Sequence, residues 1–578
     1  IKAEDSSGTA IYKYDALGNL VDLIDPHQNV THIEYDDLGR KVSMNDPDKG
    51  HWEYRYNAYG EIVCQADALA QITVSQYDIR GRLSQRRDYN AGGNCDDPDS
   101  FGTLANNTNW LYDTSANTLG KPHTILDAQT VHFQTFKYDS LGRSATKGVY
   151  VPDGPDNGWH YSKTVYDQFN RVLIHYDFAR EGNEFDKNAT LRRYNSRGYL
   201  SKIQDAYSSL VYYEVLDMDA FGNVTESILG NGVEQSDSYY QDTGLANTFA
   251  THHVLNGNLL KNKVYWDEVG NVDYREITRN GVTERENFDY DELNRLEQYQ
   301  VGNQTPTVVS YDNIGNISSK SDVQNGATYD YSSSAAGPHA VNRIGSVNYF
   351  YNANGSLISD GRGRTFTYTA FDKVSTVKQS NRKVHYLYGV DRGRYMRIDE
   401  DVSTGSKDYT YYLDDVEKIH YSNGTVKWKR NIGGVAHITQ IISGSSVSSE
   451  RISYFHKDHL GSINAITDEV GSVIEEFAFD PWGARRASTS INMSRTQVLN
   501  NWWRKSGRTT LRGFTGHEMV DVAAAEADVA GGPPSLLDAE GAEPRQREGA
   551  DEPVEHVEEG GLAVGRPLVA LARDRHHV

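Results

Sequence analysis

Apolar and polar residues alternate over short runs along this chain and do not follow helical spacing. Residues 20–24 (Leu-Val-Asp-Leu-Ile) and 30–35 (Val-Thr-His-Ile-Glu-Tyr) are rich in β-branched and apolar side chains and are too short for helices. Clusters of Asp, Pro, Asn and Gly separate such runs, as at 25–29 and 46–50. The pattern predicts an all-β fold built from strands of about five or six residues joined by tight turns.

A repeat that begins with Tyr and Asp is superimposed on this alternation. The sequences YDALGN, YDDLGR, YNAYGE and YDIRGR begin at Tyr14, Tyr35, Tyr56 and Tyr77, 21 residues apart. Looser copies begin at Tyr138, Tyr166, Tyr194, Tyr240, Tyr290, Tyr311, Tyr351, Tyr368 and Phe479, with Met218 and Trp266 at the tyrosine position of two degenerate copies. A fixed period indicates one structural unit stacked many times. We expect each unit to be a hairpin with one turn at the motif and a second turn halfway along.

The motif itself fits a type I turn followed by a bulge. In Asp36-Asp37-Leu38-Gly39 the first carboxylate would accept backbone N–H groups ahead of it, and Gly39 would take a positive φ. Two copies without this glycine have Asn170 and Asn294, the residue type that best tolerates left-handed backbone. The following Arg, as in Arg40, is expected to lie over a neighbouring Tyr ring or to pair with the turn Asp. The predicted turn residues are Tyr14, Asp15, Gly18, Tyr35, Asp36, Gly39, Arg40, Tyr56, Gly60, Tyr77, Asp78, Gly81, Arg82, Tyr138, Asp139, Gly142, Arg143, Tyr166, Asp167, Asn170, Arg171, Tyr290, Asp291, Asn294, Arg295, Tyr311, Asp312 and Gly315.

Composition narrows the function classes. The chain has 39 Tyr, 51 Gly, a mean hydropathy of −0.67 and a net charge of −22. The acidic balance argues against unassisted binding to DNA or RNA, which requires clustered Lys and Arg. No run of 18 or more apolar residues predicts a membrane span. The two cysteines, Cys64 and Cys95, are expected to be thiols, with a single bridge as the alternative.

Three downstream segments sharpen a family resemblance that covers nearly all of residues 1–520. The repeat resembles the YD repeats of Rhs proteins, of the B and C components of Tc insecticidal toxins, and of teneurins. Residues 335–357 (AAGPHAVNRIGSVNYFYNANGSL), 454–486 (YFHKDHLGSINAITDEVGSVIEEFAFDPWGARR) and 511–518 (LRGFTGHE) are similar to the Rhs-associated core and the stretch before it. The core-motif residues are His456, Asp458, His459, Leu460, Gly461, Asp480, Pro481, Trp482, Gly483, Gly513, Phe514, Thr515, Gly516, His517 and Glu518.

The resemblance implies stacked hairpins that spiral into a hollow shell, either complete or incomplete. Such a shell would enclose and deliver a C-terminal toxin domain absent from this chain, after export from a bacterium. The expected partners are a toxin domain or a complementary shell subunit, with no nucleic acid and no membrane span. No signal peptide is visible, and the start at Ile1 suggests a fragment.

The end of the chain departs from the family pattern. We divide the chain into a repeat array at 1–330, continuing repeats with the Rhs-associated core at 331–520, and an aberrant acidic tail at 521–578. The tail has no Tyr, Phe or Trp and is expected to be disordered. We interpret it as the product of a frameshift or sequence error; a short true toxin domain is the alternative. The family's Asp-Pro-x-Gly cleavage boundary is missing.

Three groups of side chains suggest chemistry but have simpler interpretations. His456-Lys457-Asp458-His459 offers metal-ligand types, yet histidines three apart point to opposite faces of a strand. Asp480-Pro481-Trp482-Gly483 aligns with a repeat turn and not with a cleavage site, and His517-Glu518 is expected to be a packed or capping pair. No nucleophile, phosphate or dinucleotide motif is present.

We therefore expect no enzyme activity, no cofactor and no metal. Two alternatives to the toxin shell remain. The first is a teneurin-like or wall-associated adhesion module in which Trp110, Trp502 and Trp503 contact carbohydrate or a receptor. The second is a self-cleaving aspartyl protease core.

Overall fold

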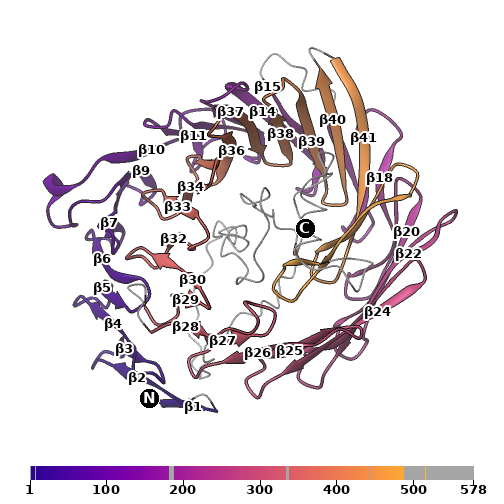
Figure 1. Ribbon diagram of the computed structural model, residues 1–578. Coiled ribbons are helices and arrows are strands. Elements are labelled where there is room, and N and C mark those ends of the chain that lie inside the picture. Colours follow the sequence, from indigo (N-terminus) through magenta and orange to yellow (C-terminus); the bar gives the residue numbers. More distant parts are fainter. Residues whose placement is uncertain are drawn as a thin grey trace.

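The computed structural model describes residues 2–6, 8–180, 188–332, 337–443 and 446–486, together with Thr515. Over these residues the fold is all-β, with strands β1 to β45 and one short 3-10 turn, η1 (Pro98–Ser100). Consecutive strands pair antiparallel with their neighbours in sequence, so the chain forms a continuous ribbon of hairpins. Figure 1 shows that this ribbon curves into a ring and then continues past its own start.

We call the 27-stranded sheet from β1 to β27 the first coil. Its strands are β1 (Lys2–Asp5), β2 (Gly8–Tyr14), β3 (Leu20–Ile24), β4 (Val30–Tyr35), β5 (Lys41–Asp46), β6 (Gly50–Tyr56), β7 (Ile62–Ala66), β8 (Ile72–Tyr77), β9 (Leu83–Tyr89), β10 (Leu104–Tyr112), β11 (Pro122–Asp127), β12 (Phe133–Tyr138), β13 (Ser144–Val151), β14 (Gly158–Tyr166), β15 (Val172–Arg180), β16 (Ala189–Tyr194), β17 (Leu200–Asp205), β18 (Val211–Met218), β19 (Val224–Leu229), β20 (Val233–Tyr239), β21 (Ala246–His253), β22 (Gly257–Trp266), β23 (Val272–Arg279), β24 (Val282–Tyr290), β25 (Leu296–Val301), β26 (Thr307–Tyr311) and β27 (Ile317–Lys320).

We call the 13-stranded sheet from β31 to β43 the second coil. Its strands are β31 (Phe350–Tyr351), β32 (Leu357–Ser359), β33 (Arg364–Tyr368), β34 (Val374–Gln379), β35 (Arg382–Tyr388), β36 (Arg394–Asp401), β37 (Ser406–Leu413), β38 (Val416–His420), β39 (Val426–Ile432), β40 (Ala436–Ser443), β41 (Ser446–Lys457), β42 (Ile463–Thr467) and β43 (Val473–Glu476). A small sheet of β28 (Tyr329–Asp330), β29 (Arg343–Ile344) and β30 (Val347–Asn348) connects the coils, and a terminal hairpin of β44 (Ala478–Phe479) and β45 (Arg485–Arg486) follows them.

The register places the first residue of the repeat at a bulge. At most motifs the antiparallel pairing shifts by one residue just before the Tyr, for example between Glu34 and Tyr35 and between Gln76 and Tyr77. The shift is the bulge predicted from the turn sequence. The strands predicted at 20–24 and 30–35 are found as β3 and β4 with those limits.

The largest buried clusters lie where the two coils meet. One joins Ile203, Tyr212 and Leu229 of the first coil to Ile432 and Tyr454 of the second. Another joins Val149, Val151 and Phe178 to Tyr395, Met396 and Tyr411. Figure 1 shows β36 to β41 running beside β11 to β18 at the top of the ring. Because a single layer of sheet cannot bury both faces, stacking of the coils creates the core.

The all-β, repeat-built and coiled fold expected from the sequence is therefore confirmed. The sheet is open, since β1 pairs only with β2 among the described strands. No helix in the described ranges is long and apolar enough to cross a membrane. The tail predicted at 521–578 lies outside the described residues.

Candidate functional surfaces of the coiled sheet

The repeat turns have the geometry that their sequence predicts. The Gly39 N–H donates to the carbonyl oxygen of Asp36 at 2.9 Å, and the Asp36 carboxylate accepts the N–H groups of Leu38 and Arg40 at 3.0 and 2.9 Å. Gly39 has φ +74°. Asn170 and Asn294, which replace the glycine in two copies, have φ +64° and +59°. The turn residues predicted in the other copies take the same arrangement.

Each repeat is also tied to its neighbour through tyrosine and arginine. The Tyr35 hydroxyl donates to the carbonyl oxygen of Leu20, and the Tyr56 hydroxyl to that of Lys41, at 3.0 and 2.8 Å. Arg40 donates to its own turn carboxylate, Asp36, and lies 4.8 Å over the Tyr56 ring of the next repeat. Arg40 therefore has both of the roles considered for it, because it pairs with the turn Asp and also lies over a neighbouring Tyr ring. The Asp36 carboxylate holds its charge readily, because the side-chain hydrogen bond from Arg40 lowers the pKa of Asp36.

The sequence did not reveal why the repeat uses tyrosine and not phenylalanine. The hydroxyl satisfies a strand carbonyl about one unit upstream, so Phe would leave that acceptor without its donor. The same contact recurs at Tyr77, Tyr138, Tyr166, Tyr194, Tyr290, Tyr311, Tyr351, Tyr368 and Tyr388. The excess of Tyr over Phe in the composition was the sequence signal that could have indicated this role of the hydroxyl.

The second surface is the line along which the second coil meets the first, which we call the seam. It brings together residues that are 202 to 319 positions apart in sequence. Asn354 donates to the Asp67 carboxylate at 2.7 Å, and Asn262 to Asn464 at 2.9 Å. A Cβ at Gly50 would lie 2.9 Å from the Ala353 carbonyl oxygen, so this glycine allows the two backbones to approach.

Ion pairs with buried carboxylates join the coils across the seam. Arg392 donates to Asp88 at 2.6 Å, and Asp88 is fully buried. Arg430 donates to Asp177 at 2.5 Å, with both side chains 4% exposed. Lys418 reaches Asp156 at 2.7 Å. In each case the acid lies in the first coil and the base in the second, and removing Arg430 would leave the buried Asp177 carboxylate without its ion-pair partner.

Arg392 also holds an uncommon backbone conformation. It occupies the bulge position of the turn Gly389-Val390-Asp391-Arg392, where most repeats have glycine, with φ +58°. A left-handed conformation costs an arginine on the order of 1 kcal/mol. The buried bond to Asp88 and the position of the ring of Phe371, 4.8 Å from the guanidinium, compensate for it.

Buried histidines lie at the same seam. Burial lowers the pKa of His132 to about 4, against the opposing charges of Asp391 and Asp127. Its ring packs on Tyr395 of the second coil, with ring centres 4.6 Å apart, and Nδ1 accepts the Val390 N–H at 3.4 Å. His132 is therefore neutral in the folded protein near pH 7.

The terminal hairpin docks on the first coil through arginines. Arg279 donates to the Phe477 carbonyl oxygen at 2.8 Å, and Arg275 to that of Phe479 at 3.2 Å. Arg486 pairs with both Glu284 and Glu286. The end of the described ribbon is thereby fixed to β23 and β24.

Most core-motif residues fall in turns of this region. Asp458 and Asp480 cap turns by accepting N–H groups two and four residues ahead, as the repeat carboxylates do. Leu460 and Gly461 lie in the first of these turns, and Pro481, Trp482 and Gly483 in the second. The Thr515 N–H donates to the Ser462 hydroxyl at 3.0 Å. Gly513, Phe514, Gly516, His517 and Glu518 lie outside the described residues.

The two histidines of the core motif do not form a ligand set. His456 is fully buried and its Nε2 lies 2.9 Å from the Thr467 hydroxyl. His459 packs edge-on against Trp266. No group of three His, Cys, Asp or Glu side chains placed to hold a metal exists among the described residues. A cavity of roughly 10 Å³ beside Asp458 and His459 has room for one water molecule.

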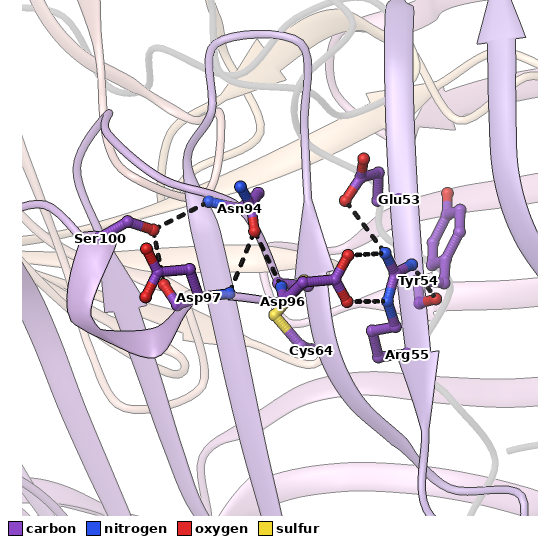
Figure 2. Close-up of a disulfide and its surroundings, with 9 residues drawn as sticks. Glu53, Tyr54, Arg55, Cys64, Asn94, Asp96, Asp97 and Ser100 are labelled. Atoms are coloured by element: carbon purple, nitrogen blue, oxygen red, sulfur yellow. Dashed lines mark hydrogen bonds and ion pairs between the residues drawn. A yellow bond between two sulfur atoms is a disulfide. The ribbon is translucent and has the colours of Figure 1, made fainter.

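The prediction for the two cysteines was wrong. Cys64 and Cys95, expected to be thiols, form a disulfide. Cys95 lies in the long connection between β9 and β10, and Figure 2 shows the bridge between this connection and β7. A bidentate pair between Arg55 and Asp96 lies beside it. The loop covers Ile72 and places Phe101 on Tyr89, so two cysteines 31 residues apart meet through packing that spacing alone does not predict.

Trp110, one of the aromatic residues considered for carbohydrate contact, does not form an open platform. It is half-buried and the Arg86 guanidinium lies 5.4 Å over its ring. Trp502 and Trp503 lie outside the described residues.

Comparisons with known proteins agree with this geometry. Residues 227–496 match the family model described as Teneurin YD-shell, and residues 14–51 match the RHS Repeat model. The turn-pinned hairpins, the coiled sheet and these matches are consistent with a YD-repeat, Rhs-type shell protein.

Individual relatives are distant. The tRNA3(Ser)-specific nuclease WapA of Bacillus spizizenii and the tRNA nuclease WapA of Bacillus subtilis are each 22% identical over 54% of this chain. This chain spans 13% of their length. A crystal structure of TcdB2-TccC3 superimposes on 89% of this chain and 29% of its own with a TM-score of 0.71 at 16% identity. A Tc holotoxin pore structure from Photorhabdus luminescens gives a TM-score of 0.69 at 17% identity, over 88% of this chain and 27% of the other. These structures share the fold.

Proposed function

We propose that this chain forms part of the wall of an exported bacterial shell that encloses a toxin domain and delivers it. The observation that carries the proposal is the seam, where a second coil is locked on the first by buried ion pairs such as Arg430 with Asp177. A ribbon that served only as a spacer would not need its second coil to be held against its first coil by buried ion pairs. The mechanism is confinement: a continuous hydrogen-bonded wall keeps proteases and targets away from the cargo until the seam opens.

The two faces of the wall support a container. Across β2 to β6 the register puts Lys13, Asp22, His32 and His51 on one face. Tyr12, Leu23, Ile33, Met44 and Trp52 occupy the opposite face. Tyr54 continues this face, and the next positions on it are the polar residues Gln65, Thr73 and Asp88, of which Asp88 meets the second coil. The apolar stretch of this face across β2 to β6 would hold a polypeptide in a non-native state, as a toxin carrier requires.

We propose that the chain acts without catalysis of its own and needs no cofactor. The repeat and core-motif carboxylates are used in turns, as Asp480 is, or in ion pairs. Export is supported by the Cys64–Cys95 bridge, because disulfides persist in oxidising compartments. The expected partners are the cargo domain and a complementary shell subunit, by analogy with the two components of TcdB2-TccC3.

Protection of an appended cargo tests the proposal. A small reporter domain is fused after residue 578, and its digestion by a broad-specificity protease is followed by immunoblotting. We expect the reporter to be protected in the parent chain and digested in a variant with Arg392→Glu and Arg430→Glu. The matched control is Arg197→Glu, an exposed arginine away from the seam. Equal digestion in all three proteins would remove the basis for enclosure.

A further inference from the structure

Among the described residues, three polar side chains with unpartnered atoms lie where the first coil leads into the second. Two of them, Tyr329 and Tyr349, belong to the buried cluster around the small sheet β28–β30 and are 5% and 8% exposed. Neither hydroxyl has a hydrogen-bond partner in the described part of the chain. Because nearly all buried polar groups in proteins are satisfied, two such hydroxyls in one cluster need an explanation.

Two neighbouring tyrosines behave differently. The Tyr331 hydroxyl donates to the carbonyl oxygen of Ile317 at 3.0 Å, and the Tyr351 hydroxyl donates to that of Val341 at 3.0 Å. Both side chains pack against the same cluster. This part of the fold therefore offers acceptors to tyrosine hydroxyls, and the two unpartnered hydroxyls are exceptions among their own neighbours.

The third side chain is Arg362, in the turn between β32 and β33. Its Nε and Nη2 atoms are buried and have no hydrogen-bond partner among the described residues. The acid of the same turn, Asp360, accepts the backbone N–H groups of Arg362 and Arg364 and pairs with the Arg364 guanidinium at 2.5 Å. The turn carboxylate is thereby committed to Arg364, and a half-buried guanidinium without a partner is costly.

Close packing brings this turn and the two tyrosines together. A Cβ at Gly361 would collide with the carbonyl oxygen of Asn348, so this glycine lets the turn lie directly on the backbone that leads into Tyr349. Burial raises the pKa of Tyr329 and of Tyr349, and the charge of Arg362 opposes the rise in both. The guanidinium therefore acts on both phenols, and both phenols keep their protons near pH 7.

The chemistry of these side chains suits an anion. A guanidinium and two protonated phenols are all donors, and the Nε–Nη2 edge of an arginine offers two parallel N–H bonds to one oxyanion. Four N–H and O–H donors match the several acceptor oxygens of a phosphate group. The other carboxylate that acts on Tyr329, Asp322, is already paired with Lys320 at 2.7 Å.

We propose that Arg362, Tyr329 and Tyr349 bind a phosphate-type oxyanion at the junction of the two coils. Access is from the turn, where Gly361 and Gly363 are exposed and a Cβ at Gly363 would meet nothing within 4 Å. The tyrosines come from the small sheet and the arginine from the first strands of the second coil, so the bound anion ties these two parts together. The site does not depend on the enclosure of a toxin.

Isothermal titration calorimetry with inorganic phosphate, at pH 7 and constant ionic strength, tests the site. We expect saturable binding of one phosphate per chain. Arg362→Gln should weaken this binding by roughly tenfold or more, the usual effect of removing a charged hydrogen-bond partner. The control is Arg343→Gln, because Arg343 lies on the same small sheet but is exposed and pairs with Asp330; it should bind phosphate like the parent.

Removal of the hydroxyls gives a second signature. Tyr329→Phe/Tyr349→Phe keeps both rings and removes two unsatisfied donors, so without phosphate this variant should melt at or above the temperature of the parent. Saturating phosphate should raise the melting temperature of the parent but not that of the variant. The matched control Tyr331→Phe/Tyr351→Phe removes hydroxyls that have acceptors, so it should melt below the parent and still respond to phosphate.

Three results would overturn the proposal. They are no saturable phosphate binding by the parent, unchanged affinity in Arg362→Gln, and a full phosphate response in Tyr329→Phe/Tyr349→Phe. Far-UV circular dichroism of each variant establishes that it is folded, so that a lost response reports on the site. The cargo-protection assay is independent of this result, because it follows digestion of the reporter and not anion binding.

Discussion

Mild acid should weaken the seam through His132. This ring is 1% exposed and lies against Tyr395 and the turn that contains Val390. Burial lowers the pKa of His132 to about 4; the carboxylates of Asp391 and Asp127 oppose this shift, and Lys147 reinforces it. The unfolded chain takes up a proton near the ordinary histidine pKa of about 6.5. His132 in the folded seam does not take up a proton near this pH.

The direction of the pH effect on stability follows from the number of protons that His132 binds in the folded and unfolded states. Between the two pKa values the unfolded state binds a proton that the native state excludes, so stability rises with pH in that window. The contribution of His132 is present above pH 6.5 and is lost as the pH falls toward 4. With these two values the loss between pH 7 and pH 5 is about 2 kcal/mol. His456 is fully buried with its pKa also lowered to about 4, so it adds a loss of similar size.

The assay compares His132→Phe with the parent in urea unfolding at pH 7, 6 and 5. Phenylalanine keeps an aromatic ring against Tyr395 but cannot take up a proton. We expect the variant to be about 1 kcal/mol less stable at pH 7, because the Val390 N–H loses its acceptor. Its further loss on going to pH 5 should be about 2 kcal/mol smaller than that of the parent.

The control is His27→Phe, at an exposed turn position of the first coil. It should retain the pH dependence of the parent. If His132→Phe also retained it in full, the seam histidine would be accessible to protons in the folded state, and the account of a closed seam would be wrong.

Three further outcomes are expected. Cys64→Ser/Cys95→Ser should lower the free energy of unfolding by roughly 4 kcal/mol in the loop-entropy description, and reduction of the parent should reproduce this in the same urea assay. Arg430→Leu should cost about 3–5 kcal/mol because Asp177 is left buried and unpaired, whereas adding Asp177→Leu should restore much of the loss in a double-mutant cycle. Gly142→Val should cost more than 1 kcal/mol, since Gly142 has φ +75°, and an unchanged melting temperature would contradict the left-handed turn.

The local unit could be predicted because its physics is confined to a few adjacent residues. A carboxylate, a left-handed position and an arginine at fixed offsets specify the turn, and the asparagines at 170 and 294 showed which position bends left-handed. The strand limits followed from alternation. The hydroxyl bond of Tyr35 to Leu20 was missed, although the excess of tyrosine over phenylalanine indicated a role for the oxygen.

The disulfide and the seam residues could not be predicted in the same way. Cys64 and Cys95 meet only because a long loop folds back over β7 and β8, and no local rule sets its path. Arg392 occupies a left-handed position against its intrinsic preference, held there by Asp88 from another coil. Both depend on packing between segments distant in sequence.

The period itself cannot tell which repeat meets which, because the separation across the seam is not constant. It is 304 residues between Asp88 and Arg392, 253 between Asp177 and Arg430, and 202 between Asn262 and Asn464. From Asp88 onward fewer residues separate the paired positions, so this part of the ribbon follows a spiral that tightens toward the terminal hairpin. On a tightening spiral, each 21-residue repeat of the second coil therefore lies opposite a different position within the repeats of the first coil. The contacts across the seam must therefore be individual ones, and the identical repeat turns stabilise only neighbours within a coil.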